Sequence, residues 1–178
     1  RVEFCLSHCD PDSALRLCNE SLARSVRPEV LALRAAVWEN KGDLSQAQKD
    51  LQQAAQMDGW AERGCLALGQ LHVAHGRLQE ALQVYRKGLG DVPGSLPIRR
   101  AMAAALLAGD VSQQAEGLAL LEELLREAPA DEDLLMVKAR FKERTDPVQA
   151  EAIYEEIVRQ HPTSAQACER MARFAVSH

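Results

Sequence analysis

The sequence predicts an all-α fold built from tandem helix-turn-helix units, and three observations support this prediction. Of the 178 residues, 52 are Ala or Leu and only 17 are Val, Ile or Thr. Ala and Leu lose little conformational freedom in a helix, whereas β-branched residues suit strands. A short turn pattern recurs after 34 residues, and prolines recur at nearly the same interval. Repetition at such a period indicates a repeat architecture in which each unit stacks on the next.

The turn pattern marks the middle of each unit. Residues 42–47 read GDLSQA and residues 76–81 read GRLQEA, and a looser copy, DPVQA, occupies residues 146–150. Three prolines spaced 36 and 33 residues apart mark the ends of units: Pro93, Pro129 and Pro162. A proline ring prevents the residue before it from continuing a helix. Each of these prolines is therefore expected just after a helix ends.

The first two complete units are predicted over residues 28–60 and 61–94. In each unit, small and apolar residues recur every three or four positions, which places them on one stripe of a helix. The first unit has the stripes Leu31, Arg34, Ala35, Trp38 and Ala47, Leu51, Ala54, Ala55. The second unit has the stripes Cys65, Leu68, Gly69, His72 and Ala81, Tyr85, Gly88, Leu89. The smallest of these residues are expected where the two helices of a unit cross most closely.

The third and fourth units are predicted over residues 95–130 and 131–163. The third unit has the stripes Ile98, Ala101, Met102, Ala105 and Gly117, Leu121, Leu124, Leu125. The fourth unit has the stripes Leu134, Val137, Lys138, Phe141 and Ala150, Tyr154, Ile157, Val158. The third unit carries about three extra residues in its turn, around Val111-Ser112-Gln113, and the fourth unit is one residue short. This shortening makes the register of its first helix ambiguous by one position.

Partial units are predicted on both sides of these four. Residues 1–27 supply the second helix of a preceding unit, with Cys5 on its partner helix, and residues 164–178 supply the first helix of a following unit. We therefore expect about eleven helices in a single solenoid over residues 1–178. Because the chain begins with Arg1 and neither end resembles the polar cap of a solenoid, we expect it to be a piece of a longer protein.

This organisation resembles the tetratricopeptide repeat family, whose 34-residue pattern is W-x2-L-G-x2-Y, then A-x3-F, then P. The second unit carries Leu68-Gly69, Ala81-x3-Tyr85 and Pro93, and the fourth carries Phe141, Ala150-x3-Tyr154 and Pro162. Two positions depart from the pattern: Gly59 replaces a Pro and Gly117 replaces an Ala. The resemblance implies a right-handed α-α superhelix of about four complete repeats, acting as a non-catalytic protein–protein interaction scaffold.

The resemblance also implies a binding surface, because in the family the first helix of each repeat lines a concave groove. The candidate groove residues are Glu39, Asn40, Arg63, Leu66, Gln70, Val73, Arg99, Ala103, Leu106 and Lys142. Residues 101–108 are apolar right around the helix, so we expect an apolar patch in mid-groove, with Ala-rich close packing as the alternative. Co-chaperones of the family grip C-terminal carboxylates with Lys, Asn and Arg. Only Asn40 stands near such a position, so a chaperone tail is not the expected ligand.

Composition excludes several classes of partner. The net charge of −5 and the 4% aromatic content argue against a nucleic-acid-binding surface. The longest apolar run, residues 101–108, is far shorter than the roughly 20 residues that span a bilayer, so we expect no direct membrane insertion. No basic-then-apolar leader opens the sequence, so we expect no signal peptide. The partner is expected to be a protein or peptide, within a multi-protein complex.

No set of residues predicts catalysis, a metal site or a cofactor. The glycines of residues 88–94 follow a helix and lack the spacing of a dinucleotide loop. His72 with His75, and Cys5 with Cys9, each lack the further ligands that a zinc site needs. We therefore expect no enzyme activity, no metal and no cofactor. The five cysteines cannot all pair, which favours a reducing compartment such as the cytoplasm, with the bacterial periplasm as the alternative.

Three functions remain open at this point. The first is a scaffold that holds a protein segment in the groove or joins subunits along its edge. The second is a structural spacer or assembly module of a larger machine, for example one for bacterial envelope export or polysaccharide secretion. The third is a regulatory array attached to an enzyme outside this chain.

Overall fold

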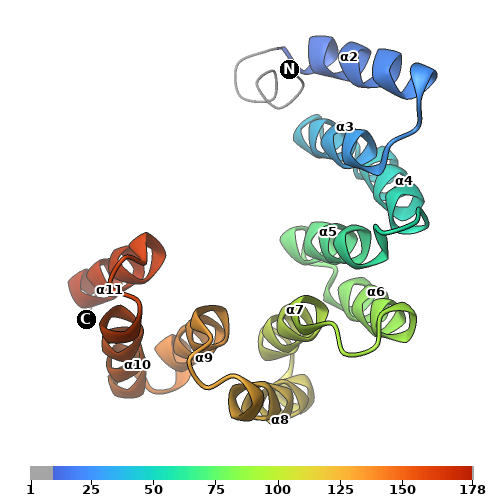
Figure 1. The fold of residues 1–178 in the computed structure, drawn as a ribbon. Helices are drawn as coiled ribbons and strands as arrows, with labels where there is room; N and C mark the ends of the chain where they lie inside the picture. Colours follow the sequence, from blue (N-terminus) through green and yellow to red (C-terminus); the bar gives the residue numbers. More distant parts are fainter. Residues whose placement is uncertain (1–9, 178) are drawn as a thin grey trace. The chain divides into compact units, whose positions relative to one another are not determined.

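The computed structural model describes residues 10–177, and their side chains as far as Arg173. This part of the chain contains ten α-helices and no strand, which confirms the predicted all-α fold class (Figure 1). The helices are α2 (Pro11–Arg24), α3 (Pro28–Asn40), α4 (Leu44–Ala55), α5 (Ala61–Ala74), α6 (Leu78–Asp91), α7 (Leu96–Leu107), α8 (Val111–Glu127), α9 (Glu132–Thr145), α10 (Pro147–Gln160) and α11 (Ala165–Ser177). The helix predicted to carry Cys5 lies outside the described residues.

The helices form two compact units, the first ending at Ala101 and the second beginning at Met102, within α7. In the first unit, α3 packs on α4 and α5 packs on α6, and the two hairpins meet where α4 contacts α5. In the second unit, α9 packs on both α8 and α10, and α10 packs on α11. Contacts between successive helices therefore dominate each unit, as expected for a repeat array.

The recurring turn pattern forms the tight turn between the two helices of a hairpin. Gly42 and Gly76 have φ values of +80° and +71°, a left-handed backbone that favours glycine because it lacks a Cβ atom. After Gly42, the Asp43 side chain accepts a hydrogen bond from the backbone N–H of Gln46 at 3.1 Å. This N-cap satisfies one of the backbone donors that the first turn of α4 leaves unpaired.

In the first unit, the helices of a hairpin approach so closely that only a small residue fits between them. A Cβ atom on Gly69 of α5 would lie 2.2 Å from Cε1 of the buried Tyr85 on α6. The hairpin α3–α4 contains an ion pair in addition to its apolar cluster of Ala35, Ala47 and Leu51. Arg34 donates to the buried carboxylate of Asp50 through Nε at 2.8 Å and Nη2 at 2.7 Å. These hydrogen bonds raise the pKa of Arg34, and the guanidinium also donates to Oδ1 of Asn19 on α2 at 2.7 Å.

In the second unit, the turn between α7 and α8 has the usual length, and the prediction of extra residues in this turn is wrong. Three residues, 108–110, connect the two helices, as 41–43 and 75–77 do in the first unit. The additional residues lengthen α8, which begins at Val111. Asp110 and Gln113 form a capping box, in which each side chain bonds the backbone N–H of the other residue. This cap fixes the start of α8 ahead of the residues expected to form a loop.

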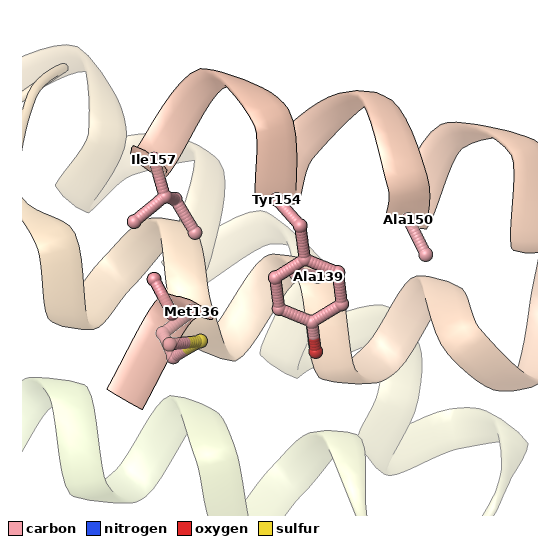
Figure 2. Close-up of a cluster of buried hydrophobic side chains, with 6 residues drawn as sticks. Met136, Ala139, Ala150, Tyr154 and Ile157 are labelled. Carbon is pink, nitrogen blue, oxygen red and sulfur yellow. The ribbon is translucent and has the colours of Figure 1, made fainter. Parts of the chain in front are cut away.

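The turn between α9 and α10 is a single residue, Asp146, which ends α9 and caps α10. This turn is two residues shorter than the turns 41–43, 75–77 and 108–110. Leu134 and Phe141 of the predicted stripe on α9 are buried, but the centre of the buried face differs by one position from the prediction. Ala139, and not Lys138, is fully buried in the cluster that contains Ala150 and Tyr154. Figure 2 shows the side chains of Ala150, Tyr154 and Ile157 pointing from α10 toward this face of α9.

Candidate functional site

The first unit has a groove between α3 and α5, with a volume of about 310 Å³, which we call the alanine groove. Its lining residues are Ala32, Ala35, Ala36, Glu39, Leu51, Ala67, Gln70, Leu71 and Ala74. Eight of these nine lie on α3 or α5, the first helices of two successive hairpins. Ala36 and Ala74 are exposed, whereas Ala35, Leu51 and Leu71 are buried. The groove therefore has a closed apolar floor and open alanine walls.

The polar rim of the alanine groove is short. Glu39 of α3 meets His75, the residue just after α5, with 3.0 Å between Oε1 and Nε2. Gln70 adds an exposed amide on the α5 side. Because most of the lining consists of methyl groups, this groove can accept apolar side chains of a bound segment and offers few directional contacts.

The second unit has a groove of similar volume, about 320 Å³, which we call the arginine groove. Its lining residues are Ala104, Leu107, Ala108, Val137, Arg140, Phe141, Glu143, Arg144 and Arg170. These residues lie on α7, α9 and α11, with Ala108 just after α7. The first helices of successive hairpins again form the walls, but here the lining has three arginines beside its two alanines.

Arg144 is fixed by neutral neighbours. Its Nη2 atom donates to the backbone carbonyl oxygen of Leu107 at 2.7 Å. Its guanidinium carbon lies 5.9 Å from the centre of the Phe141 ring, within the range of a cation–π contact. A carbonyl oxygen and an aromatic ring orient the side chain without neutralising its positive charge.

The single carboxylate in the arginine groove is bound by a hydroxyl group. Tyr154 donates a hydrogen bond to Oε1 of Glu143 at 2.5 Å. Burial of Tyr154 raises its pKa, and the hydrogen bond and the charge of Glu143 raise it further, whereas Arg170 and Arg140 lower it. The charges of both arginines therefore act on the Tyr154 hydroxyl group.

Of the predicted groove residues, Glu39 and Gln70 line the alanine groove. Asn40, Arg63 and Val73 are exposed, and Leu66, Arg99 and Lys142 are half-buried. None of these six is among the residues that line either groove.

Two predicted groove residues are core residues, and the expectation that they form an open apolar patch is wrong. Ala103 and Leu106 each have an exposed fraction of 0%. The reason is the close approach of α8 to α7. A Cβ atom placed on Gly117 would lie 2.9 Å from Cβ of Leu106, so the glycine lets the two helices pack tightly there. Part of the apolar stretch is thus covered by the chain itself, whereas Ala104, Leu107 and Ala108 line the arginine groove.

The three arginines are functional candidates that the sequence pattern does not single out. The predicted register of α9 assigns Lys142 to the groove and does not include Arg140 or Arg144. Arg170 lies on a helix for which the pattern predicts no groove residue. The signal that could have found them is Asp146-Pro147, an N-cap residue followed by a proline at the first helical position. The turn pattern already includes residues 146–150, but it does not show that Asp146 both ends α9 and caps α10, which is what gives the shorter turn.

A third cavity, of about 370 Å³, lies against α4, α5 and α6 in the first unit and includes Cys65. The Cys65 thiol donates to the carbonyl oxygen of Val84 at 3.2 Å, and burial raises its pKa. A thiol with a raised pKa is a poor nucleophile at neutral pH. Within residues 10–177, the structure shows no cluster of three potential metal ligands and no helix long and apolar enough to cross a membrane.

The comparisons with known proteins agree on one fold. The family model described as tetratricopeptide repeat matches residues 2–140. TTC0263, a thermophilic TPR protein of Thermus thermophilus, aligns with a TM-score of 0.72 and 18% identity over 93% of this chain and 91% of its own. YrrB, a TPR protein with an unusual peptide-binding site, aligns with a TM-score of 0.58 and 14% identity over 95% and 87%. No curated protein matches the chain significantly.

Proposed function

The chain belongs to the tetratricopeptide repeat family, and from this premise we propose that it binds a protein segment along the first helices of its repeats. Tetratricopeptide repeats are in general protein-interaction scaffolds and are typically non-catalytic. The finer part of the proposal, the use of the first-helix grooves, rests on the structure of each unit. We also propose that the chain itself carries no enzyme activity.

One observation carries this proposal: each unit has a groove of just over 300 Å³ whose walls come from first helices. Protein segments are recognised by pockets that accept successive side chains, and a volume of this size holds two or three of them. YrrB, which shares the fold, has a peptide-binding site, and this supports the same class of ligand here. A structural spacer that binds no ligand does not require a groove with exposed alanine walls, whereas a segment-binding scaffold does.

Site-specific photocrosslinking in the organism of origin tests the proposal. A photoreactive amino acid replaces Gln70 in the alanine groove or, as a matched control, Gln83 on α6. Both glutamines are exposed, and they lie on neighbouring helices of one hairpin. We expect a covalent partner from position 70 and none from position 83. Equal capture at both positions, or capture at position 83 alone, would contradict a groove-binding scaffold.

A charge placed in the groove provides an independent measurement. The double substitution Ala36→Glu and Ala74→Glu puts two carboxylates on the alanine walls, where they cannot be desolvated cheaply by an apolar ligand. We expect the affinity for the crosslinked partner to fall at least about tenfold. The control Ala23→Glu, on the exposed side of α2, should leave it unchanged. An array that binds no segment at all, as a structural spacer would, gives no capture at either glutamine.

A further inference from the structure

The arginine groove is unusual for the unit that contains it. Residues 102–178 carry eight Lys and Arg and fourteen Asp and Glu, a net charge of −6. Three of those eight cations line one groove, which contains a single carboxylate. A surface with excess negative charge places its cations beside carboxylates unless another interaction holds them apart.

Arg140 and Arg170 have no ion pair or hydrogen bond with any residue that the structure describes. Other arginines of this unit do have carboxylate partners: Arg159 pairs with Glu156, and Arg173 pairs with Glu169 at 2.6 Å. Glu143 is the only carboxylate in the groove lining, and its Oε1 atom accepts a hydrogen bond from the Tyr154 hydroxyl group, with 2.5 Å between the two oxygen atoms. The Tyr154 hydroxyl takes only one of the two carboxylate oxygens, so Glu143 keeps its negative charge, and a lining of three arginines and one glutamate carries a net charge of +2.

One of the three arginines, Arg144, is also preorganised for an anion. Arg144 is held by the Leu107 carbonyl and the Phe141 ring, so little of its conformational freedom remains to be lost on binding. Arg140 and Arg144 are four residues apart on α9 and therefore share one face of the helix. Arg170 adds a third guanidinium from α11. Guanidinium groups bind carboxylates with two parallel hydrogen bonds, which are among the stronger polar contacts in proteins.

We propose that the arginine groove binds an acidic segment of a partner protein, with side-chain carboxylates of Asp or Glu placed on Arg140 and Arg170. This inference rests on the proposed function, since it names the chemistry of the segment that the second unit takes. The methyl groups of Ala104, Leu107 and Val137 form the apolar part of the lining and contact apolar side chains between the acidic ones. A segment in which acidic and aliphatic residues alternate matches this lining.

A nucleic acid does not fit the same groove. The net charge of −6 on the unit repels a polyanion beyond the groove itself. Phe141 is the one aromatic side chain in the lining, and it is only 8% exposed, so the groove offers no stacking surface for bases. A short peptide places its charges only where the arginines lie.

Fluorescence anisotropy with the complete chain tests the proposal. The probe is a labelled eight-residue peptide of alternating Glu and Leu with both ends blocked, and its counterpart has Gln in place of Glu. We expect the Glu peptide to bind at least about tenfold tighter at low salt, with the difference shrinking as salt screens the charges. Blocked ends ensure that side-chain carboxylates, and not a C-terminal carboxylate, are measured.

The double variant Arg140→Ala and Arg170→Ala should lose the preference for the Glu peptide. Its matched control, Arg159→Ala and Arg173→Ala, removes the same charge from the same unit and should keep the preference. The variant Arg140→Lys and Arg170→Lys keeps the charge and the fold and should bind with intermediate affinity, since lysine lacks the planar fork. Unchanged helix content by circular dichroism confirms that each variant is folded.

Three results would overturn the inference: equal binding of the two peptides, equal losses in the two double alanine variants, or tighter binding of an eight-nucleotide single strand than of the Glu peptide. None of these three results depends on the crosslinking experiment at Gln70, which tests the proposed scaffold function. Crosslinking at Gln70 together with equal binding of the peptides removes the acidic-segment inference and leaves the scaffold function in place. If there is neither crosslinking at Gln70 nor a preference for the Glu peptide, both the scaffold function and the acidic-segment inference are wrong.

Discussion

The two units use the same kind of helix pair but treat their arginines in opposite ways. In the first unit, Arg34 lies between two helices of a hairpin and is neutralised by two hydrogen bonds to Asp50. In the second unit, Arg140 and Arg170 lie in the groove without a carboxylate partner among the described residues, and Arg144 binds only a carbonyl oxygen and a ring. The first arrangement stabilises the fold, and the second leaves charge available to a ligand. A repeat scaffold thus leaves its groove positions free to differ from one unit to the next.

The largest expected effect comes from removing the ring at the centre of the second unit. Tyr154 is fully buried, so Tyr154→Ala leaves a cavity and should destabilise that unit by about 3–5 kcal/mol. Stability in a repeat array is largely a sum over neighbouring repeats. Hydrogen exchange should therefore show α9 and α10 losing protection before α3 and α4. Uniform loss of protection along the whole chain would contradict this local picture.

The next effect compares the two kinds of arginine. Asp50→Ala leaves Arg34 without its carboxylate and should cost about 2 kcal/mol, less than for a fully buried pair because water reaches part of the guanidinium. Arg140→Ala removes a side chain without an ion pair and should change the free energy of unfolding by less than about 0.5 kcal/mol. Denaturant titration of both variants checks the contrast. Equal losses would mean that the groove arginine is structural.

A smaller effect comes from the residue that faces each buried tyrosine. Gly69→Ala places a methyl group 2.2 Å from Cε1 of Tyr85, so the ring must move, and we expect a loss of about 1–2 kcal/mol. In the second unit, an alanine already stands in the cluster around Tyr154. Ala139→Gly should therefore cost about 1 kcal/mol, through lost packing and the greater freedom of glycine in a helix. Thermal unfolding of both variants measures the two costs, and a stabilising Gly69→Ala would refute the close crossing.

The smallest effect depends on pH and is confined to the first unit. Burial lowers the pKa of His72 below its ordinary value of 6.5. Below pH 6.5 the unfolded chain then binds a proton that the folded chain does not, so stability falls as the pH falls. The stability contributed by neutral His72 is fully present above pH 6.5. His72→Leu should flatten the dependence of the unfolding free energy on pH between about 7 and 5. An unchanged slope would mean that other titratable groups cause this pH dependence.

The sequence is sufficient to predict the helices and their pairing, because apolar spacing, turn glycines and prolines act locally. The capped start of α8 at Asp110 and Gln113 is equally local, yet the longer spacing there also fits a loop, and the sequence alone favours the loop. The groove is harder to predict, since a one-residue error in the register of α9 changes the direction assigned to every side chain of that helix. Leu106 shows a second limit of sequence-based prediction. Its burial depends on how closely Gly117 lets α8 approach α7.

Sequencing the partner segments captured by each groove tests the central claim most directly. A photoreactive amino acid at Gln70 reports on the alanine groove, and one at the exposed Ala108 reports on the arginine groove without removing an arginine. We expect segments crosslinked at Ala108 to be rich in Asp and Glu, and segments crosslinked at Gln70 not to be. Segments of the same composition at both positions would contradict this claim.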